Sequence, residues 1–323
     1  MPEKEVLAVI HWGIIGLGNI AKRFAEGLKY SDVGSLYGGA SHNEDKRAYF
    51  KEKYGIKTYD NYYDLLEDDE IDVVYIALPH GMHYQWIKEA LNRNKAVLCE
   101  KPITLDYSEL QELIELSKQK HTFLMEAMKT RFIPMTKQIQ KLVDDNVIGD
   151  ILRIETSFCN DVPYMKNHYL YDEKQGGILY DCGIYNIASI LQFIKSEVKE
   201  MRVDYKKKYN VDVDDKIEMT FESGQTAFIE CSMIQSKEKT MKIYGSKGTV
   251  TVSPFYRPQE ALVEFNNGES FTGYLPYDND DFYSEIEEVH RCLGFIEIES
   301  PLMSHEDSLK CIELMLKIKE KLV

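Results

Sequence analysis

The segment with the densest chemical content runs from Gly176 to Asn186, where two glycines are followed by Asp181 and Tyr185. These two side chains are four residues apart, so in a helix they bring a carboxylate and a phenol to one face. A phenol near an ammonium ionises more readily, which makes it an acid and base suited to neutral pH. The glycines would let the backbone approach a ligand closely. A buried helix with purely structural hydrogen bonds is the alternative, and the spacing leaves both interpretations open.

A suitable ammonium is present at Lys101, within Glu100-Lys101-Pro102, directly after the apolar run 96–99. That run is typical of a buried parallel strand, and open α/β sheets bind ligands at the carboxyl ends of such strands. We therefore expect Lys101 to contact a substrate hydroxyl and to stabilise the oxyanion that develops there. A surface lysine before a turn proline is the alternative. The sequence does not decide whether the Lys101-Pro102 bond is cis.

A glycine-rich loop, Gly16-Leu17-Gly18-Asn19-Ile20-Ala21, follows an apolar run and opens a helical stretch. In the pattern G-x-G-x-x-A the first glycine permits a tight turn, and the second lets the backbone approach a pyrophosphate. The small residue at the sixth position lets the helix pack on the strand. Backbone N–H groups at the helix start, near Asn19 and Ile20, would face the anion. The context favours a dinucleotide loop over an ordinary glycine-rich turn.

The end of the next expected strand indicates which dinucleotide is bound. Enzymes that use NAD usually place an acid there for the ribose 2′-hydroxyl. This strand instead ends in Ser41 and His42, with Lys46 and Arg47 one turn further on. Ser41 and His42 could donate to a 2′-phosphate, which favours NADP, with NAD still possible. The alternative is that they are solvated residues at the start of a helix.

The elements that must position these residues fall into two groups. Strands expected at 6–15, 35–40, 71–78, 96–99 and 122–125 alternate with helices at 19–29, 44–54, 83–94 and about 106–118. This alternation predicts an α/β Rossmann domain with a doubly wound parallel sheet, residues 1–126. From 127 to 323 we expect a substrate-binding α+β domain with a mainly antiparallel sheet. Its expected strands are 151–158, 216–221, 226–233, 240–244 and 249–252, and its expected helices are 133–146, 282–292 and 306–322.

Composition excludes several classes of function. The 39 lysines and arginines face 54 acids, and a net charge of −15 disfavours nucleic acid and anionic membrane surfaces as partners. The start, Met1 to Glu5, is polar, and no apolar run approaches the ~18 residues of a membrane span. Six dispersed cysteines suit a reducing compartment, so we expect a cytoplasmic protein. His80 and His83 have no third ligand placed by the sequence, so we expect no metal.

Several motifs in a fixed order resemble the family of glucose–fructose oxidoreductase, inositol dehydrogenase and dimeric dihydrodiol dehydrogenase (Gfo/Idh/MocA), over nearly the whole chain. They are the glycine loop, Ala77-Leu78-Pro79-His80 with His83, Glu100-Lys101-Pro102, Glu126-Ala127-Met128, and Gly176 to Tyr185. The resemblance implies a Rossmann domain plus an open, mainly antiparallel sheet that often dimerises. It implies that Lys101 is the catalytic lysine, that Tyr185 is the acid and base, and that Asp181 is the pocket carboxylate. It also implies cofactor contacts at Leu78, Pro79, His80, His83, Glu100, Lys101 and Arg131.

Leu124 to Ala127, Thr130-Arg131-Phe132 and His80 resemble the dihydrodiol dehydrogenase branch in particular. Lys129 stands where members acting on aromatic diols carry tryptophan, which weakens an aromatic-diol assignment. The substrate class therefore stays open among sugars, polyols and dihydrodiols, and a homodimer or higher homo-oligomer is expected. Two other functions known in this fold are a non-catalytic dinucleotide-sensing regulator and an NAD-assisted glycoside hydrolase. Retention of Lys101, Asp181 and Tyr185 argues against a sensor.

Overall fold

The computed structural model describes residues 9–322. The start of the first expected strand, residues 6–8, lies outside them. The chain forms two compact units. Among the described residues, unit 1 contains 9–104, 108–127 and 278–305, and unit 2 contains 105–107, 128–277 and 306–322. The units divide the chain differently from the single boundary expected between residues 126 and 127, because the segment 278–305 returns to unit 1.

Unit 1 is built on a six-stranded parallel sheet, as the alternation of strands and helices predicted. Its strand order β3-β2-β1-β4-β5-β6 is that of a doubly wound dinucleotide-binding sheet, and the order reverses between β1 and β4. The carboxyl ends of β1 and β4 therefore border the crevice where such sheets bind ligands. The strands are β1 (Ile10–Ile15), β2 (Gly34–Ala40), β3 (Lys57–Tyr59), β4 (Val73–Ile76), β5 (Ala96–Glu100) and β6 (Leu124–Ala127).

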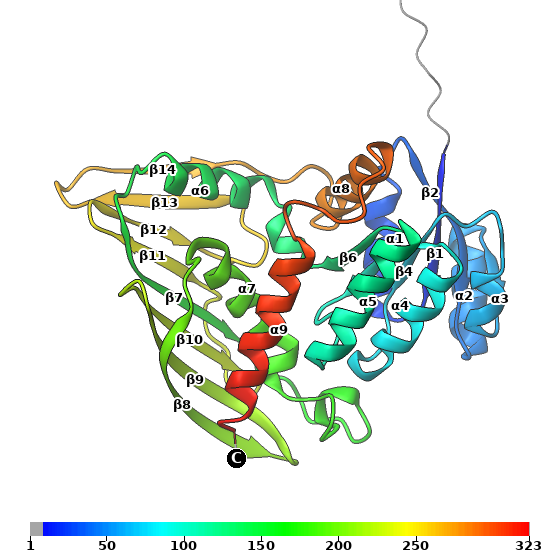
Figure 1. Cartoon of the computed structure of the whole chain (residues 1–323), viewed down its shortest axis with the longest axis horizontal. Coiled ribbons are helices and arrows are strands. Elements are labelled where there is room, and N and C mark those ends of the chain that lie inside the picture. Colours follow the sequence, from blue (N-terminus) through cyan, green and yellow to red (C-terminus); the bar gives the residue numbers. More distant parts are fainter. Residues whose placement is uncertain (1–8, 323) are drawn as a thin grey trace, which may run out of the picture. The chain divides into compact units, whose positions relative to one another are not determined.

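Helices cover this sheet, with α1, α2 and α3 contacting β2, and α4 contacting β4 and β5 (Figure 1). Local signals define their ends: the Asn43 side chain caps α2 by accepting from the Lys46 N–H, and Gly55 ends α2 in the left-handed conformation. The helices are α1 (Asn19–Leu28), α2 (Glu44–Tyr54), α3 (Tyr62–Leu66), the short 3₁₀ helix η1 (His80–Met82), α4 (His83–Asn92), α5 (Tyr107–Lys120) and α8 (Tyr283–Gly294).

The returning segment joins the core of unit 1 through α8. The Trp12 indole N–H donates to His290 at 2.9 Å, and Arg23 forms an ion pair with the buried Asp281. Phe24 stacks on Tyr75 with ring centroids 3.9 Å apart and meets Phe282 edge-on. Because Trp12, Phe24 and Phe282 are fully buried, the 278–305 segment is part of the apolar core of unit 1.

Unit 2 is built on an eight-stranded sheet in the order β14-β13-β12-β11-β7-β10-β9-β8. All neighbouring pairs are antiparallel except β7 with β10, so the expectation of a mainly antiparallel sheet is confirmed. The sequence analysis did not identify β8, β13 and β14. The strands are β7 (Ile151–Cys159), β8 (Val198–Lys208), β9 (Val211–Phe221), β10 (Thr226–Ser232), β11 (Met241–Gly245), β12 (Gly248–Val252), β13 (Glu260–Phe265) and β14 (Ser270–Tyr274).

Within unit 2, α7 packs on β7 and β10, and α6 packs on β13. In Figure 1 the helices α6, α7 and α9 lie on one face of the sheet, and no helix of the described chain is drawn over the other face. The helical segments of this unit are the 3₁₀ helix η2 (Lys129–Arg131), α6 (Pro134–Asp144), the 3₁₀ helix η3 (Tyr169–Tyr171), the π-helical turn η4 (Leu179–Gly183), α7 (Ile184–Phe193) and α9 (His305–Lys319).

Three further observations bear on function. In the part of the chain that the structure describes, no helix is both long and apolar enough to cross a membrane. The same residues include no group of three or more His, Cys, Asp or Glu side chains that could hold a metal ion. All six cysteines are buried, and none of them forms a disulfide in the described chain.

Candidate active site

The glycine loop of unit 1 turns sharply at the carboxyl end of β1. Gly16 has φ +95°, a conformation that other residues rarely adopt, and its N–H donates to the Ala40 carbonyl at 3.0 Å. A Cβ at Gly16 would lie 2.5 Å from the Ala77 carbonyl oxygen, just beyond β4. Only glycine therefore lets the loop pack against the end of the neighbouring strand.

Gly18 has different surroundings, because a Cβ built there would meet nothing within 4 Å. It precedes α1, whose first turn has no acidic residue and no side-chain hydrogen bond at the N-cap. The first N–H groups of a helix carry partial positive charge and lack partners within the helix. A pyrophosphate would fit here, because the space at Gly18 is open, the helix start has no side-chain cap, and the glycine loop turns tightly. The residues present therefore suit the dinucleotide that the motif predicts.

At the carboxyl end of β2, the residues expected near a 2′-phosphate are held by local contacts. The Ser41 side chain accepts from the Asn43 N–H at 3.2 Å, and Arg47 donates to the Ser41 carbonyl at 2.7 Å. The exposed His42 ring bonds through Nδ1 with the Asp60 carbonyl at 2.8 Å. These contacts put a hydroxyl, an imidazole and a guanidinium close together, and no acidic side chain occurs at positions 39–43.

His83 connects the loops that follow β4 and β5. Its fully buried ring lies 2.9 Å from the Pro102 carbonyl through Nδ1 and 2.9 Å from the Leu78 carbonyl through Nε2. Burial lowers the pKa of His83, although both carbonyls favour the charged form, and the Lys101 ammonium lowers it further. His83 therefore fixes the backbone at Leu78 and at Pro102. Through these two bonds, the loop that carries the expected cofactor contacts Leu78, Pro79 and His80 is held next to the loop that carries Lys101.

Two acidic side chains, Glu100 and Glu126, accept hydrogen bonds from the backbone of the Glu100-Lys101-Pro102 segment and of the residue after it. The Tyr75 hydroxyl donates to the Glu100 carboxylate, whose other oxygen accepts from the Lys101 N–H at 3.3 Å. Glu126 is buried on β6 and accepts from the Ile103 N–H at 3.1 Å. The Lys101-Pro102 bond, which the sequence left undecided, is cis. These contacts fix the backbone on both sides of Lys101.

In unit 2, the segment that carries Asp181 and Tyr185 is a π-helical turn that continues into α7. From Gly176 to Ile190, Asp181 and Tyr185 are the only two residues that are not buried. The pattern of exposure therefore agrees with the expectation that they share a face, although the turn between them is wider than an α-helical turn. Single π turns inside helices are frequent at functional sites.

The start of this segment is anchored to β9 and α9. Asp212 is buried, accepts from the Leu179 N–H at 2.9 Å and forms an ion pair with Lys319 at 2.7 Å. Gly177, with φ +102°, would place a Cβ 2.4 Å from the Asp212 carboxylate. We expected this glycine to admit a ligand, whereas its nearest contact is the carboxylate that anchors the π-helical turn.

A second acid of β9, Asp215, is fully buried, and neither of its oxygens has a hydrogen-bond partner among the described residues. Burial, with the nearby charge of Asp212 adding to it, raises the pKa of Asp215 to about 9. Asp215 is therefore protonated and uncharged at neutral pH, and Asp212 is the acid that balances Lys319.

An aromatic pair lies next to Tyr185. The ring of Phe158 on β7 stacks on Tyr256 at 4.8 Å and lies 5.6 Å from the Tyr185 ring. The backbone carbonyl of Tyr256 accepts from the Thr130 hydroxyl at 3.0 Å. The Lys129 ammonium lies 5.8 Å from the Tyr256 ring. A partly exposed phenol, a stacked aromatic pair and an ammonium group therefore lie close together in unit 2.

Arg131 is the remaining expected cofactor contact. It is buried in unit 2, where its guanidinium donates to the Ala188 carbonyl of α7 at 2.8 Å and lies 3.8 Å from Asp307. These contacts tie the segment after β6 to α7 and α9. Within unit 2, Arg131 supports the helix that begins with Tyr185.

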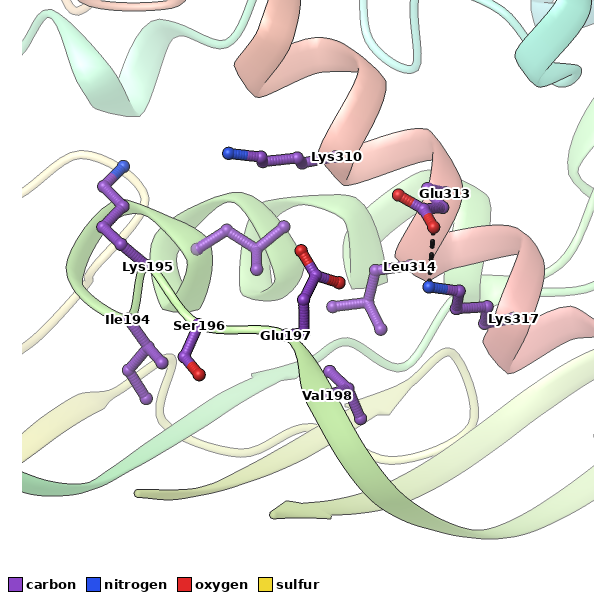
Figure 2. A pocket seen from close by; sticks show the side chains of 10 residues that line it. Ile194, Lys195, Ser196, Glu197, Val198, Lys310, Glu313, Leu314 and Lys317 are labelled. Atoms are coloured by element: carbon purple, nitrogen blue, oxygen red, sulfur yellow. Dashed lines mark ion pairs between the residues drawn. The ribbon is translucent and has the colours of Figure 1, made fainter. Parts of the chain in front are cut away.

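A pocket of unit 2 lies between the end of α7, the start of β8 and α9, and none of the expected site residues line it (Figure 2). Its lining mixes apolar side chains such as Ile194 and Leu314 with lysines and glutamates. Lys317 pairs with Glu313 at 2.7 Å, and Lys310 pairs with Glu306 at 2.6 Å. Because these lysines already have acidic partners, this pocket offers less for an anionic or reactive ligand than the surroundings of Tyr185.

The sequence analysis missed several residues that build the site. Tyr75 and Glu126 support the Lys101 segment, and Asp212 with Lys319 anchors the π-helical turn. The supporting role of Glu126, a residue of the family motif, carried a readable signal, since Glu126 is an acid within an otherwise apolar strand. Asp212 carried none, because its strand contains further acids. Tyr256 had none, because an aromatic residue in a loop between strands has no pattern that marks it as a site residue.

Two family models match the chain. One, described as an oxidoreductase family with an NAD-binding Rossmann fold, matches residues 10–128. The other, described as the GFO/IDH/MocA C-terminal domain, matches residues 136–251. Both models fall on the regions where the structure shows the parallel and the mainly antiparallel sheet.

Similar proteins include enzymes that act on diols and on sugars. A trans-1,2-dihydrobenzene-1,2-diol dehydrogenase of Danio rerio is 29% identical over 95% of each chain. A D-xylose 1-dehydrogenase (NADP(+)) of Hypocrea jecorina is 29% identical over 95% of this chain and 90% of that protein. The crystal structure of a 3-ketoreductase of Actinomadura kijaniata with NADP and TDP-benzene is 26% identical, covers 97% of each chain and has a TM-score of 0.87. The chain belongs to the Gfo/Idh/MocA family of oxidoreductases.

Proposed function

We propose that this oxidoreductase transfers hydride between NADP(H) and a hydroxyl or carbonyl carbon of a sugar, polyol or dihydrodiol, with Lys101 and Tyr185 handling the proton. The main support for the proposal is the set of groups at one edge of the unit 1 sheet. There the Gly16 to Gly18 loop, the bare start of α1 and Lys101 all follow the carboxyl ends of parallel strands. That edge combines an anion-binding loop with a reactive amine.

When bound, the nicotinamide coenzyme supplies or accepts the hydride. During oxidation Tyr185 acts as the phenolate and takes the proton of the substrate hydroxyl, which returns Tyr185 to the phenol, and the Lys101 ammonium stabilises the negative charge that develops on the substrate oxygen. The contacts of Glu100 and His83 hold the backbone around Lys101, so that its charge is oriented before the substrate arrives. Asp181 completes the polar wall beside Tyr185.

NADP is proposed over NAD for two reasons. The end of β2 offers Ser41, His42 and Arg47 in place of an acid, and these groups suit a 2′-phosphate. In addition, the xylose dehydrogenase and the 3-ketoreductase described above carry NADP in their names or complexes.

Lysine and tyrosine variants of the Actinomadura kijaniata reductase, K→A, K→E and Y→F, have also been crystallised with TDP-benzene and NADP. Studies of a lysine and a tyrosine in a relative support the choice of Lys101 and Tyr185 here. We further propose a cytoplasmic homodimer, or a higher homo-oligomer, formed through the face of the unit 2 sheet that no described helix covers. Six buried cysteines, none in a disulfide among the described residues, suit that compartment.

The test is a screen of sugars, polyols and dihydrodiols with NADP+ and NAD+, read at the absorbance of the reduced nicotinamide. For the best substrate, Lys101→Met and Tyr185→Phe should each lower kcat by about a hundredfold or more, because each removes one proton-handling group. NADP+ affinity, measured by calorimetry, should stay near wild type in Tyr185→Phe.

Lys51→Met and Tyr274→Phe are the matched controls, since both side chains are exposed and outside the candidate site. Both should retain wild-type rates. Full activity of the Lys101 and Tyr185 variants would refute their roles. NADP+ binding without turnover of any alcohol would instead favour a dinucleotide sensor, and sugar release without net NADP+ reduction would favour a hydrolase.

A further inference from the structure

Two half-buried cations of unit 2 form no ion pair, whereas the other half-buried cations of this unit do. Within the described part of unit 2, four lysines and arginines are half-buried: Arg153, Lys239, Arg257 and Lys319. Arg153 pairs with Glu155 at 2.7 Å, and Lys319 pairs with Asp212 at 2.7 Å. Lys239 and Arg257 form no ion pair with any described residue. Partial burial removes water from a charge, so an unpaired half-buried cation costs free energy that a ligand can recover.

Each of the two unpaired cations lies over one ring of the same stacked pair. The Arg257 guanidinium lies 5.2 Å from the centre of Tyr256, and the Lys239 ammonium lies 5.8 Å from the centre of Phe158. These rings form the stacked pair beside Tyr185, at 4.8 Å from each other. The buried Lys129 approaches Tyr256 as well. Two unpaired positive charges therefore lie on the aromatic pair that adjoins the proposed catalytic phenol.

Contact with aromatic rings does not by itself account for this concentration of charge. A cation over a ring gains about 0.5–1 kcal/mol at exposed sites, which is less than a charge-assisted hydrogen bond provides. The chain carries a net charge of −15, so its overall field would repel an anionic ligand everywhere except near such a local group. A positive cluster next to Tyr185 is therefore suited to attract and orient an anion at that one place.

We propose that the substrate carries an anionic group, a phosphate or a carboxylate, and that Arg257 and Lys239 bind it beside the Phe158–Tyr256 pair. This inference rests on the proposed function for the role of Tyr185. The aromatic pair packs against the body of the substrate, and the two cations take its charged end. Because the two cations lie on Phe158 and Tyr256, the charged end lies toward that pair, and the reacting hydroxyl lies toward Tyr185.

The experiment compares glucose, glucose 6-phosphate and glucuronate on protein saturated with NADP+, so that the phosphate sites of the cofactor are already filled. Calorimetry measures binding of each compound, and absorbance measures turnover. The variants are Arg257→Met and Lys239→Met. Lys137→Met is the matched control, because Lys137 is an exposed lysine of α6 without an ion pair. The separate phosphate and carboxylate compounds distinguish the two anions.

We expect an anionic compound to bind wild-type protein at least tenfold more tightly than glucose. The preference should fall about tenfold to a hundredfold in Arg257→Met and Lys239→Met, as expected for the loss of a charge-assisted hydrogen bond, and stay unchanged in Lys137→Met. Equal affinity for the neutral and both anionic compounds, or a preference that survives both variants, overturns the inference. Failure to bind NADP+ or to oxidise any alcohol would instead refute the proposed function, since anion binding is measured without turnover.

Discussion

At the scale of single residues, the two glycines of the nucleotide loop serve different ends. Gly16 is required by the fold, because its positive φ and the Ala77 carbonyl leave no space for a side chain. Gly18 has an ordinary extended backbone and open space around it, so nothing in the described protein requires glycine there. Its small size is useful only to a ligand that approaches the backbone.

Alanine substitutions should separate these two roles. Gly16→Ala adds backbone strain of about 1–3 kcal/mol and a clash with a strand end, so the melting temperature should fall by several degrees. Gly18→Ala should leave the melting temperature near wild type and weaken NADP+ binding about tenfold or more, because its methyl group occupies the space of the pyrophosphate. Thermal unfolding and calorimetry measure the two effects. Equal NADP+ affinity in Gly18→Ala and wild type would contradict the placement of the pyrophosphate.

At the scale of elements, the π-helical turn depends on strand β9. Asp212 holds the turn through Leu179, and Lys319 of α9 balances its charge. Asp215, three residues further along β9, has lost its charge through burial, with a pKa raised to about 9. Between about pH 4 and pH 9 the folded chain therefore keeps a proton that the unfolded chain releases. Stability falls as the pH rises through this window.

Asp215→Asn should remove this dependence, because asparagine keeps the shape of a protonated aspartate and does not ionise. The melting temperature of the variant should exceed that of wild type by an amount that grows from pH 5 to pH 8. The difference in the free energy of unfolding between variant and wild type should grow by at most about 1.4 kcal/mol per pH unit.

Asp214→Asn is the control with the opposite sign. Burial opposes ionisation of Asp214, but the ion pair with Lys206 at 2.8 Å outweighs it and lowers the pKa. Removing that carboxylate should cost stability at neutral pH, and the cost should disappear as the solution becomes acidic. Parallel pH profiles for Asp215→Asn and wild type would show that Asp215 ionises normally.

At the scale of the whole molecule, the sheet of unit 2 presents a broad face that bears side chains of both charges. Arg202, Asp204, Lys216 and Glu218 alternate there around the half-buried ring of Phe228. An antiparallel sheet with one covered face exposes the other to solvent or to a partner. A mixed surface around an aromatic ring can complement a second copy of itself, since each copy offers both charges.

Light scattering after size-exclusion chromatography should therefore give a mass of at least twice the 37.5 kDa of one chain. Phe228→Glu should shift the mass toward that of a single chain, because a dimer would bury two unpaired carboxylates. Lys137→Glu, on α6 at the covered face, should leave the mass unchanged. A monomeric wild type, or an assembly unaffected by Phe228→Glu, would rule out this face as the interface.

What the sequence determined by itself was local or repeated in a pattern. The parallel sheet follows from alternating apolar runs and helices, and the glycine loop follows from the conformations that only glycine adopts. Asn43 and Gly55 define both ends of α2 through short-range hydrogen bonds. Family membership followed because several such motifs occur in order along the chain.

Only the tertiary structure decided which distant residues meet. It returned residues 278–305 to the first unit, brought Lys319 to Asp212, and placed Lys239 and Arg257 on one aromatic pair. It also gave Gly177 a protein carboxylate as neighbour where a ligand was expected. The physical reason is that hydrogen bonding along the chain acts over a few residues, whereas burial and charge pairing depend on what the fold brings together from any distance.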